Sequence, residues 1–485
     1  MVTQVNLVSL VRAIADSEIL EVAQRFFGEF RDRVAELIRK FLDSGPSPGA
    51  TLDLENALFE ILRILGRDMI QRVFSLLEPE LDEMPETVQH QGETYRRLAR
   101  KTERPSVLTR FGNVSLVRGR YRLGRAGKAI FPLEMILGIQ DGFTPSAADR
   151  VGKQFAATGS SQGRTLEMIR DQMGERIGTE KLRKIVKTLA EEMEPFREQT
   201  QVERLTELIM EARKTGEKPV LSVSRDGVAL GLAPWSSFEM ASVATISVLA
   251  GGERLGTVYL GSAPETNQAT MSANLTSLLT ETIRACGQQV PEIVYVTDAG
   301  KIETAYWKNT LRSFFVDGRR IKITRVVDYY HASERLTKIA DALNFSTEGR
   351  RKDWLKKVRG ILLEPGGHGR VLRSIGAMRT NLGYKISAIE EATKAERYLR
   401  RYRRFMDYAG LKEQGYPLGS GVVESACKQV VSERMKLSGM RWHHTGGQRT
   451  MTLRCLLLSG IWDKVYRQYT ASKPTVADLM HSKTL

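Results

Sequence analysis

The sequence has few of the residues that build disulfide frameworks and zinc knuckles. Its 485 residues include three cysteines and six histidines. Cys286, Cys427 and Cys455 lie far apart, and none of them belongs to a Cys-x-x-Cys pair. This spacing argues against a zinc ribbon and against a disulfide-stabilised fold, and it fits a reducing compartment.

Long apolar runs are also missing. No apolar stretch reaches the roughly 18 residues that a membrane span needs, and acidic residues close behind the first apolar run are unlike a secretory signal. We therefore expect a cytoplasmic protein with no membrane partner. Acidic residues are the scarcer charge, with 57 Asp and Glu against 73 Lys and Arg, for a formal net charge of +16. The excess predicts a polyanionic partner, although an ordinary basic enzyme shares this property.

The chain is long enough for two to four domains, and 41% of its residues are apolar, which suffices for a buried core. Changes of pattern divide it into six segments. We expect a helical N-terminal domain at 1–100, a basic hairpin and helix-turn-helix-like region at 101–200, an α/β segment at 214–331, a helical segment at 332–418, a return to the α/β domain at 419–470 and a polar tail at 471–485.

The first 200 residues combine helical and basic patterns. Apolar residues at helical spacing in 54–77 predict helices of an ordinary domain or of a surface for a partner subunit. Two β-prone runs around Gly112-Asn113 predict a hairpin. The arginines that follow would share one strand face, which meets either phosphates or solvent. These arginines are Arg118, Arg120 and Arg122. Three helices at 144–195 fit a helix-turn-helix or a plain helical domain.

From Lys218 the pattern alternates between strand and helix, which predicts a mixed sheet with helices packed on it. Gly251-Gly252 between two of the strands is a hairpin pattern. The expected strands are 220–224, 242–249, 256–260, 293–297 and 321–327, and the expected helices are 270–286 and 303–314.

Residues 332–417 return to helix and contain two densely basic stretches. The second stretch interleaves arginines with aromatic residues. A helix of this kind buries its rings and presents its guanidinium groups to phosphates or to solvent. The candidate phosphate contacts are Arg400, Arg401, Arg403 and Arg404.

Three carboxylates occupy positions typical of a metal site. Asp226 and Asp298 each follow an apolar strand, and Glu424 begins a helix after a Gly-Ser-Gly turn. Neighbouring parallel strands would place the two aspartates side by side. Mg²⁺ prefers oxygen ligands, and two such ions act on the attacking and leaving oxygens of a phosphodiester. Taken singly, each residue is also a common turn or helix-start residue.

Asp328 and His331 follow the next predicted strand. They form either a hydrogen-bonded pair beside the site, in which the carboxylate accepts from the imidazole, or a helix cap next to a packed histidine. Lys428 lies one helical turn after Glu424, where it can hold a phosphate.

Five motifs together resemble the DDE-type transposases of bacterial insertion sequences, in the group usually labelled ISKra, with Mutator-like features. They cover about residues 218–462, roughly half the chain. The motifs are Ser-Arg-Asp226-Gly, Val-Thr-Asp298-Ala-Gly, Asp328-Tyr-Tyr-His331, Gly419-Ser-Gly-Val-Val-Glu424-Ser and Arg434-Met-Lys-Leu-Ser-Gly-Met-Arg-Trp442. The resemblance implies an α/β, ribonuclease H-like catalytic domain (214–331 and 419–470) with a mixed sheet, interrupted by an all-helical insertion (332–418) and preceded by mostly α-helical N-terminal domains.

The resemblance also implies the activity, which is Mg²⁺-dependent cleavage at transposon ends and strand transfer into target DNA, with Mn²⁺ as a substitute ion. Asp226, Asp298 and Glu424 would be the metal ligands, with Asp328 and His331 in support. The partners would be double-stranded DNA and at least a second copy of the chain. Further DNA contacts would come from Lys428, Arg434, Lys436, Arg441 and Trp442.

One departure from the family concerns zinc. Similar proteins often carry a Cys-x-x-Cys knuckle after the basic hairpin, and the stretch 122–130 has none. We therefore expect no structural zinc. Two other functions stay open at this point: a non-cleaving DNA-binding protein derived from a transposase, and a structure-specific nuclease of the same fold.

Overall fold

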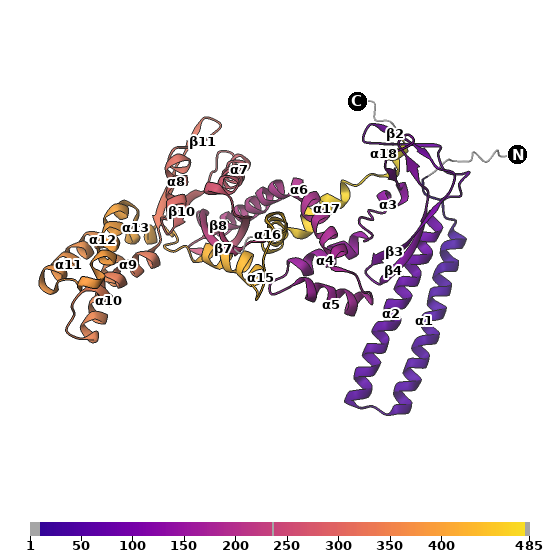
Figure 1. Cartoon of the computed structure of the whole chain (residues 1–485), viewed down its shortest axis with the longest axis horizontal. Coiled ribbons are helices and arrows are strands. Elements are labelled where there is room, and N and C mark those ends of the chain that lie inside the picture. Colours follow the sequence, from indigo (N-terminus) through magenta and orange to yellow (C-terminus); the bar gives the residue numbers. More distant parts are fainter. Residues whose placement is uncertain (1–9, 235–236, 481–485) are drawn as a thin grey trace. The chain divides into compact units, whose positions relative to one another are not determined.

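The computed structural model describes residues 10–234 and 237–480, which form two compact units (Figure 1). The described part of residues 1–193 and 464–485 makes up unit 1, and residues 194–463 make up unit 2. The last of the three helices predicted at 144–195 is longer than expected. As α6 (Thr179–Lys214) it continues through Pro195, a residue type that normally ends a helix, and so contributes to both units.

Unit 1 begins with a long helical hairpin. α1 (Asp16–Ser44) and α2 (Pro48–Leu77) are joined by a short connection and lie side by side, so they run antiparallel (Figure 1). α1 stops at Gly45, whose φ of 73° suits glycine. α2 starts after Ser47, whose hydroxyl accepts a hydrogen bond from the Ala50 N–H over 3.1 Å. The helical prediction is therefore confirmed for this part of the segment.

The helical prediction is wrong for the rest of residues 1–100. β1 (Thr87–His90) and β2 (Glu93–Arg97) form an antiparallel pair there. Gln91 and Gly92 connect them with φ values of 52° and 78°, the backbone of a two-residue hairpin turn. β5 (Tyr121–Arg122) and β6 (Ala129–Ile130) extend this sheet in the order β1-β2-β5-β6.

The predicted basic hairpin is present, with its turn two residues earlier than expected. β3 (Thr102–Thr109) pairs with β4 (Gly112–Arg118), and Thr109 faces Gly112, so Arg110 and Phe111 form the turn. The remaining elements of unit 1 are α3 (Pro132–Ile136), α4 (Pro145–Ala156), α5 (Gln162–Met173), most of α17 (Trp462–Ala471) and α18 (Val476–Met480).

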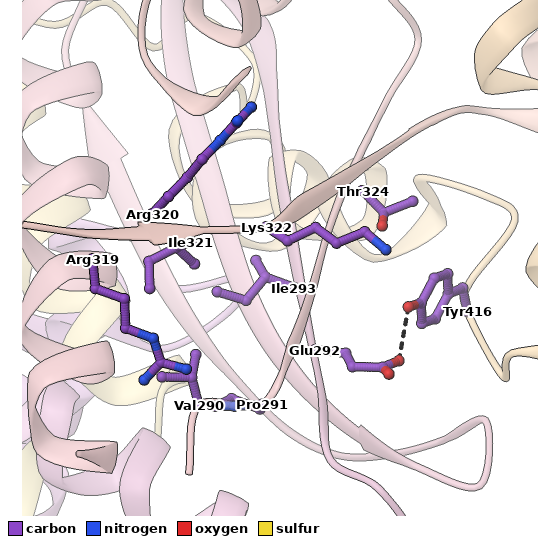
Figure 2. Close-up of a pocket in the computed structure, with 10 residues that line it drawn as sticks. All are labelled: Val290, Pro291, Glu292, Ile293, Arg319, Arg320, Ile321, Lys322, Thr324 and Tyr416. Carbon is purple, nitrogen blue, oxygen red and sulfur yellow. Dashed lines mark hydrogen bonds between the residues drawn. The ribbon is translucent and has the colours of Figure 1, made fainter. Parts of the chain in front are cut away.

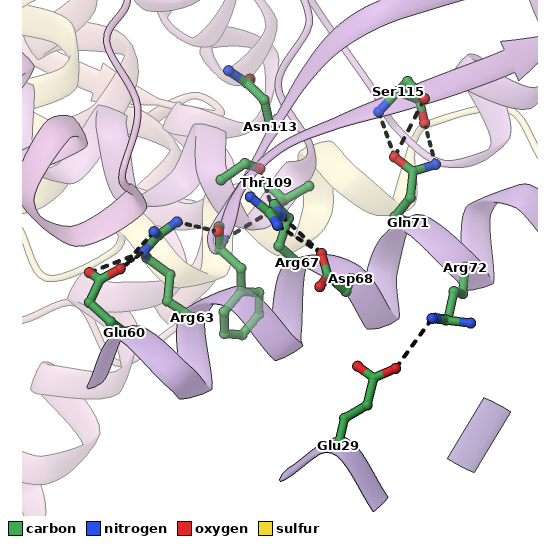
Figure 3. Close-up of polar contacts among 12 residues, drawn as sticks. Glu29, Glu60, Arg63, Arg67, Asp68, Gln71, Arg72, Thr109, Asn113 and Ser115 are labelled. Carbon is green, nitrogen blue, oxygen red and sulfur yellow. Dashed lines mark hydrogen bonds and ion pairs between the residues drawn. The ribbon is translucent and has the colours of Figure 1, made fainter. Parts of the chain in front are cut away.

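Polar contacts attach α2 to this hairpin (Figure 3). Ser115 N donates to the Gln71 side-chain oxygen over 2.7 Å, and the Gln71 amide nitrogen donates back to Ser115 O over 3.0 Å. Arg63 donates to Phe111 O over 3.3 Å. On its other side, α2 meets α1 through an ion pair of 3.6 Å between Arg72 and Glu29. Two sides of α2 are therefore occupied within unit 1.

Unit 2 is built on a mixed five-stranded sheet, as predicted, with the strand order β13-β10-β7-β8-β9. Three strands form an antiparallel meander: β7 (Val220–Gly231), β8 (Phe238–Ala250) and β9 (Glu253–Ser262). β10 (Glu292–Thr297) and β13 (Ile323–Val327) add to the free edge of β7, both parallel to it. Gly251 and Gly252, with φ of 57° and 85°, make the predicted turn between β8 and β9.

Both faces of the sheet are covered. Successive residues of a strand point to opposite faces, so Val223 and Tyr295 pack with α6 and α7 (Ala269–Cys286), whereas Val294 and Val296 pack with α9 (Tyr329–Ala342). The helix predicted at 303–314 is shorter than expected, as α8 (Lys301–Asn309). A small hairpin of β11 (Phe314–Val316) and β12 (Arg319–Ile321) follows it.

The segment predicted at 332–418 is helical. It begins within α9 and continues with α10 (Glu348–Leu362), α11 (Gly367–Leu382), α12 (Ile389–Tyr402) and α13 (Tyr408–Glu413). After it come α14 (Gly421–Ala426), a π-helical turn η5 (Cys427–Ser432), α15 (Glu433–Met435) and α16 (His444–Leu458). Gly460, with φ of 67°, separates α16 from α17.

Candidate active site

Three aspartates lie level with one another on three neighbouring parallel strands. Tyr295 of β10 faces Val223 of β7, and Thr297 of β10 faces Val327 of β13. Extending these registers by a few residues places Asp298 between Asp226 on one side and Asp328 on the other. Because the three strands are parallel, this row marks one edge of the sheet.

The prediction that Asp226 ends its strand is wrong. β7 continues to Gly231, and Asp226 faces Val243 of β8 inside the meander. On its other side, however, β10 ends at Thr297, and Asp298 begins a turn. Asp226 therefore stands where one side of its strand loses its partner. Because β10 ends here, Asp226 can take part in a site at the edge of the sheet although it lies inside its own strand.

Asp226 shares its surroundings with the other predicted ligands. The pKa of Asp226 is raised to about 6, chiefly by burial and also by the negative charges of Asp298 and Glu424, while a hydrogen bond from Gly227 N and the nearby His331 oppose the increase. The carboxylates from β7, the β10 turn and α14 thus lie close enough to repel one another. The structure thus places the three predicted ligands near one another, although the described residues whose ligand atoms all lie within 4.8 Å are Asp328, His331 and Glu424.

The Asp298 turn is held in a left-handed conformation. Ala299 has φ of 64°, which costs a residue with a Cβ about 1 kcal/mol. One Asp298 oxygen accepts from Gly300 N over 2.8 Å. Two tyrosines of α12 hold the turn from outside: the Tyr398 hydroxyl donates to Asp298 O over 2.8 Å, and the Tyr402 hydroxyl donates to Ala299 O over 3.2 Å. The helical insertion therefore fixes the backbone that carries Asp298.

Another tyrosine attaches the insertion at the far end of the strands. Figure 2 shows a pocket of about 250 Å³ at the start of β10 and β13, where the Tyr416 hydroxyl donates to the Glu292 carboxylate over 2.7 Å. Arg319 and Lys322 also line this pocket. The pocket lies at the amino ends of the strands, so it is separate from the aspartate row.

A fourth acidic residue near Asp298 was missed by sequence reasoning. Glu303 belongs to the first turn of α8 and is only 8% exposed. Burial raises its pKa, and the charges of Asp298 and Asp226 add to the effect. A Cβ on Gly300 would overlap the Glu303 carboxylate. The glycine therefore makes room for this carboxylate, which a one-dimensional pattern does not reveal.

Asp328 is fully buried and links two segments of the chain through its side chain. One of its oxygens accepts from the backbone N–H groups of Tyr330 and His331, which caps α9. The other accepts from both the backbone N–H and the hydroxyl of Ser420. Asp328 thereby ties the end of β13 to the Gly-Ser-Gly turn before α14. A Cβ on Gly419 would lie 2.8 Å from the Tyr330 ring, so a larger residue here would displace that ring.

The predicted hydrogen bond from the His331 imidazole to Asp328 is absent, because the cap occupies that carboxylate. The imidazole lies instead between two glutamates, with Nε2 3.5 Å from Glu424 Oε1 and Nδ1 3.3 Å from Glu334 Oε2. Asp328, His331 and Glu424 each offer a ligand atom within 4.8 Å of the others, an arrangement that could hold a metal ion. His331 is thus beside Glu424 rather than paired with Asp328.

The helix that carries Glu424 contains an irregular turn. Residues 427–432 form the π-helical turn η5, and Arg454 of α16 donates to the carbonyls of Gln429 and Val430 in that turn. Arg454 is completely buried. A π turn leaves carbonyls without their usual i+4 partners, and π turns often occur at functional sites. The guanidinium group satisfies these carbonyls and so stabilises the turn after Glu424.

The predicted DNA contacts divide into exposed and buried residues. Arg400, Arg401, Arg403 and Arg404 are exposed while Tyr402 beside them is buried, as predicted. Lys428, Lys436 and Arg441 are also exposed.

Two of the predicted DNA contacts are buried and serve the fold. Arg118 is 7% exposed and pairs with the Glu134 carboxylate, so the expected single face with Arg120 and Arg122 does not form. Arg434 is completely buried, and burial lowers its pKa to about 10. Its guanidinium lies 5.5 Å from the centre of the half-buried Trp442 ring. The predicted phosphate contacts at Arg118 and Arg434 are therefore wrong for this conformation.

Comparisons with protein-family models and with curated proteins found no match to this chain. Among the described residues, no helix is long and apolar enough to cross a membrane.

Proposed function

We propose that the protein is a DDE-type DNA transposase with a ribonuclease H-like catalytic domain. The observation that carries the proposal is the row of Asp226 and Asp298 on adjacent parallel strands, with Glu424 brought to the same place by α14. The strand order supports it, since an antiparallel meander is extended by two parallel strands. The helical segment between β13 and α14 corresponds to the insertion that the family resemblance implies.

The donor set suits Mg²⁺ or Mn²⁺. Asp226, Asp298 and Glu424 would hold the ions through carboxylate oxygens. Burial and, to a smaller extent, the charges of Asp298 and Glu424 raise the pKa of Asp226, and a bound cation would offset both effects. When bound, such ions supply charge neutralisation and an activated oxygen for phosphodiester chemistry. The cluster of Asp328, His331 and Glu424 offers a further group of ligand atoms.

The surrounding residues position the ligands. Asp328 holds Ser420, whose hydroxyl also lies 3.0 Å from Glu424 Oε1, so this link sets the start of α14. Tyr398 holds the Asp298 carbonyl. The catalytic work of the chain itself is therefore orientation and the placement of charge.

Double-stranded DNA is the proposed substrate. The net charge of +16 and the exposed arginines at the end of α12 favour a polyanion. Transposon ends must be paired before transfer, so we propose that the protein acts as a homodimer or a higher homo-oligomer.

A joining assay tests the proposal. Labelled duplexes from the segments that flank the reading frame are incubated with a plasmid, Mg²⁺ and the full chain. Covalent transfer of the label to the plasmid supports a transposase. Cleavage without joining would favour a structure-specific nuclease, and binding without either reaction would favour a non-cleaving DNA-binding protein.

A further inference from the structure

The hairpin of α1 and α2 leaves an apolar surface uncovered. Ten large hydrophobic side chains on the two helices are between 37% and 67% exposed, and all of them except Ile19 fall on one line along each helix. The remaining nine are Leu20, Phe27, Ile38 and Leu42 on α1 and Leu52, Phe59, Leu62, Met69 and Val73 on α2. We call this set the hairpin stripe. Monomeric proteins rarely leave so many large apolar groups together in solvent.

The positions on each helix form one line. On α2 the spacing is seven, three, seven and four residues, which is the a/d pattern of a coiled coil. On α1 the spacing is seven, eleven and four, which are also whole numbers of helical turns. Such spacing places each set on a single side of its helix.

Both lines lie on the same side of the hairpin. Successive residues of a helix are about 100° apart around its axis. On this basis, the stripe residues of each helix lie roughly 100° around the axis from the side that contacts the other helix. In an antiparallel pair, equal rotations of this kind bring both lines to one common face. A different set of apolar residues lies between the two helices. These residues are less exposed than the stripe residues, and they include Val22, Phe26 and Phe41 of α1 and Leu65 of α2.

The rest of the hairpin is either occupied or charged. The β3–β4 hairpin takes one side of α2 through Gln71 and Arg63 (Figure 3). Sides of the helices outside the stripe carry exposed charges such as Glu21, Arg39 and Asp53. The uncovered apolar face is therefore specific to one side.

We infer that the hairpin stripe is a self-association surface, on which the α1–α2 hairpin of a second copy packs to form a four-helix bundle. The occupant follows from shape and area. Two helices with parallel apolar lines are half of a bundle, and a two-fold axis supplies the identical other half. The exposed parts of the nine side chains amount to on the order of 600 Å² of apolar surface, near the ~800 Å² per partner of a stable interface once a polar rim is added.

The inference does not depend on the catalytic proposal, since the stripe belongs to unit 1 and the carboxylates belong to unit 2. It names the surface through which two copies would meet, which the activity alone does not specify. DNA is unsuited to this face, because the stripe is apolar and phosphates require cations.

The test measures the mass of the full chain in solution by light scattering and sedimentation, without DNA. The double variant Phe27→Glu/Phe59→Glu places charges at the centre of the stripe and is expected to weaken self-association roughly 100-fold or more. The control Phe315→Glu/Ile386→Glu makes the same change at exposed apolar residues of unit 2. Circular dichroism verifies that each variant folds.

The inference predicts a dimeric wild type, a dimeric control and a monomeric, folded stripe variant. A monomeric wild type at tens of micromolar would overturn it, because an unassociated hairpin would then tolerate the exposed stripe. A stripe variant that stays dimeric would also overturn it, and would place the interface elsewhere. If the stripe variant unfolds, the milder Leu62→Ser/Met69→Ser variant must lower the dimer fraction for the inference to stand.

Discussion

The Tyr398 hydroxyl donates a hydrogen bond to the backbone carbonyl of Asp298 over 2.8 Å. One residue of the helical insertion thus holds the backbone of a proposed metal ligand a hundred positions earlier in the chain. The helical segment is therefore part of the scaffold of the proposed active site, and its removal would release the Asp298 turn.

Tyr398→Phe removes this hydrogen bond and keeps the ring. We expect cleavage of end DNA to slow by roughly tenfold, with DNA affinity unchanged, because a positioning contact is lost and no phosphate contact is touched. The matched control is Tyr330→Phe, since Tyr330 is 65% exposed. Equal rates for Tyr398→Phe and wild type would show that the insertion does not position Asp298.

The raised pKa of Asp226 predicts an effect on stability. A carboxyl group whose pKa rises from 3.8 to about 6 on folding favours the folded state most below pH 4, and this contribution is lost as pH increases to 6. In metal-free protein above pH 6, Asp226→Asn should therefore raise the free energy of unfolding by about 3 kcal/mol. Denaturant unfolding at pH 4 and pH 7 checks this, since the gain should vanish at pH 4.

Magnesium provides the complementary measurement. Adding Mg²⁺ should raise the melting temperature of the wild type, because a cation bound to the native state stabilises it. The Asp226→Asn variant should respond much less. A wild type that is indifferent to millimolar Mg²⁺ and Mn²⁺ would argue against a metal site at these carboxylates.

Arg454 provides a test of the π turn that follows Glu424. Arg454→Met leaves the carbonyls of Gln429 and Val430 without their donor, so we expect a loss of about 2–4 kcal/mol in unfolding free energy. Arg454→Lys keeps the charge but lacks the planar pair of donors. Its free energy of unfolding should therefore lie between those of the wild type and Arg454→Met. If both variants match the wild type in stability and cleavage, the π turn does not depend on this residue.

The arginines at the end of α12 should set the salt dependence of DNA binding. Replacing Arg400, Arg401, Arg403 and Arg404 by Gln should flatten the slope of log affinity against log salt by up to about 3.6, at roughly 0.9 per contact. The matched control replaces four exposed arginines of α1, at positions 25, 31, 33 and 39, and should leave the slope unchanged. An unchanged slope in the α12 variant would assign these arginines to a solvated face.

Two members of the aspartate row were predictable because they follow strand ends, which apolar runs reveal, whereas Asp226 lies inside its strand. Asp298 and Asp328 directly follow β10 and β13, and the mixed sheet was anticipated from the alternation of strands and helices. The hairpin turn at Gln91-Gly92 was missed because glutamine rarely adopts the positive φ that the first turn residue requires, where asparagine, aspartate or glycine is usual.

Burial was the main quantity that the sequence did not reveal. In the sequence, Arg118 and Arg434 cannot be told apart from phosphate-binding arginines. In the structure, Arg118 pairs with Glu134 and Arg434 is buried in a core. Glu303 and Arg454 act through contacts set by the three-dimensional packing of α8 and α16. Similarly, His331 pairs with glutamates because a backbone cap already occupies Asp328.

The most direct test of the account compares cleavage and binding for the three carboxylates. Asp226→Asn, Asp298→Asn and Glu424→Gln are each assayed with labelled end DNA in Mg²⁺, beside a gel-shift measurement of affinity. We predict that each variant loses cleavage and retains binding, because the ligands hold cations while other residues hold phosphates. If a folded variant cleaves near the wild-type rate, the substituted residue does not belong to the active site. If all three variants cleave near the wild-type rate, the proposed function is contradicted.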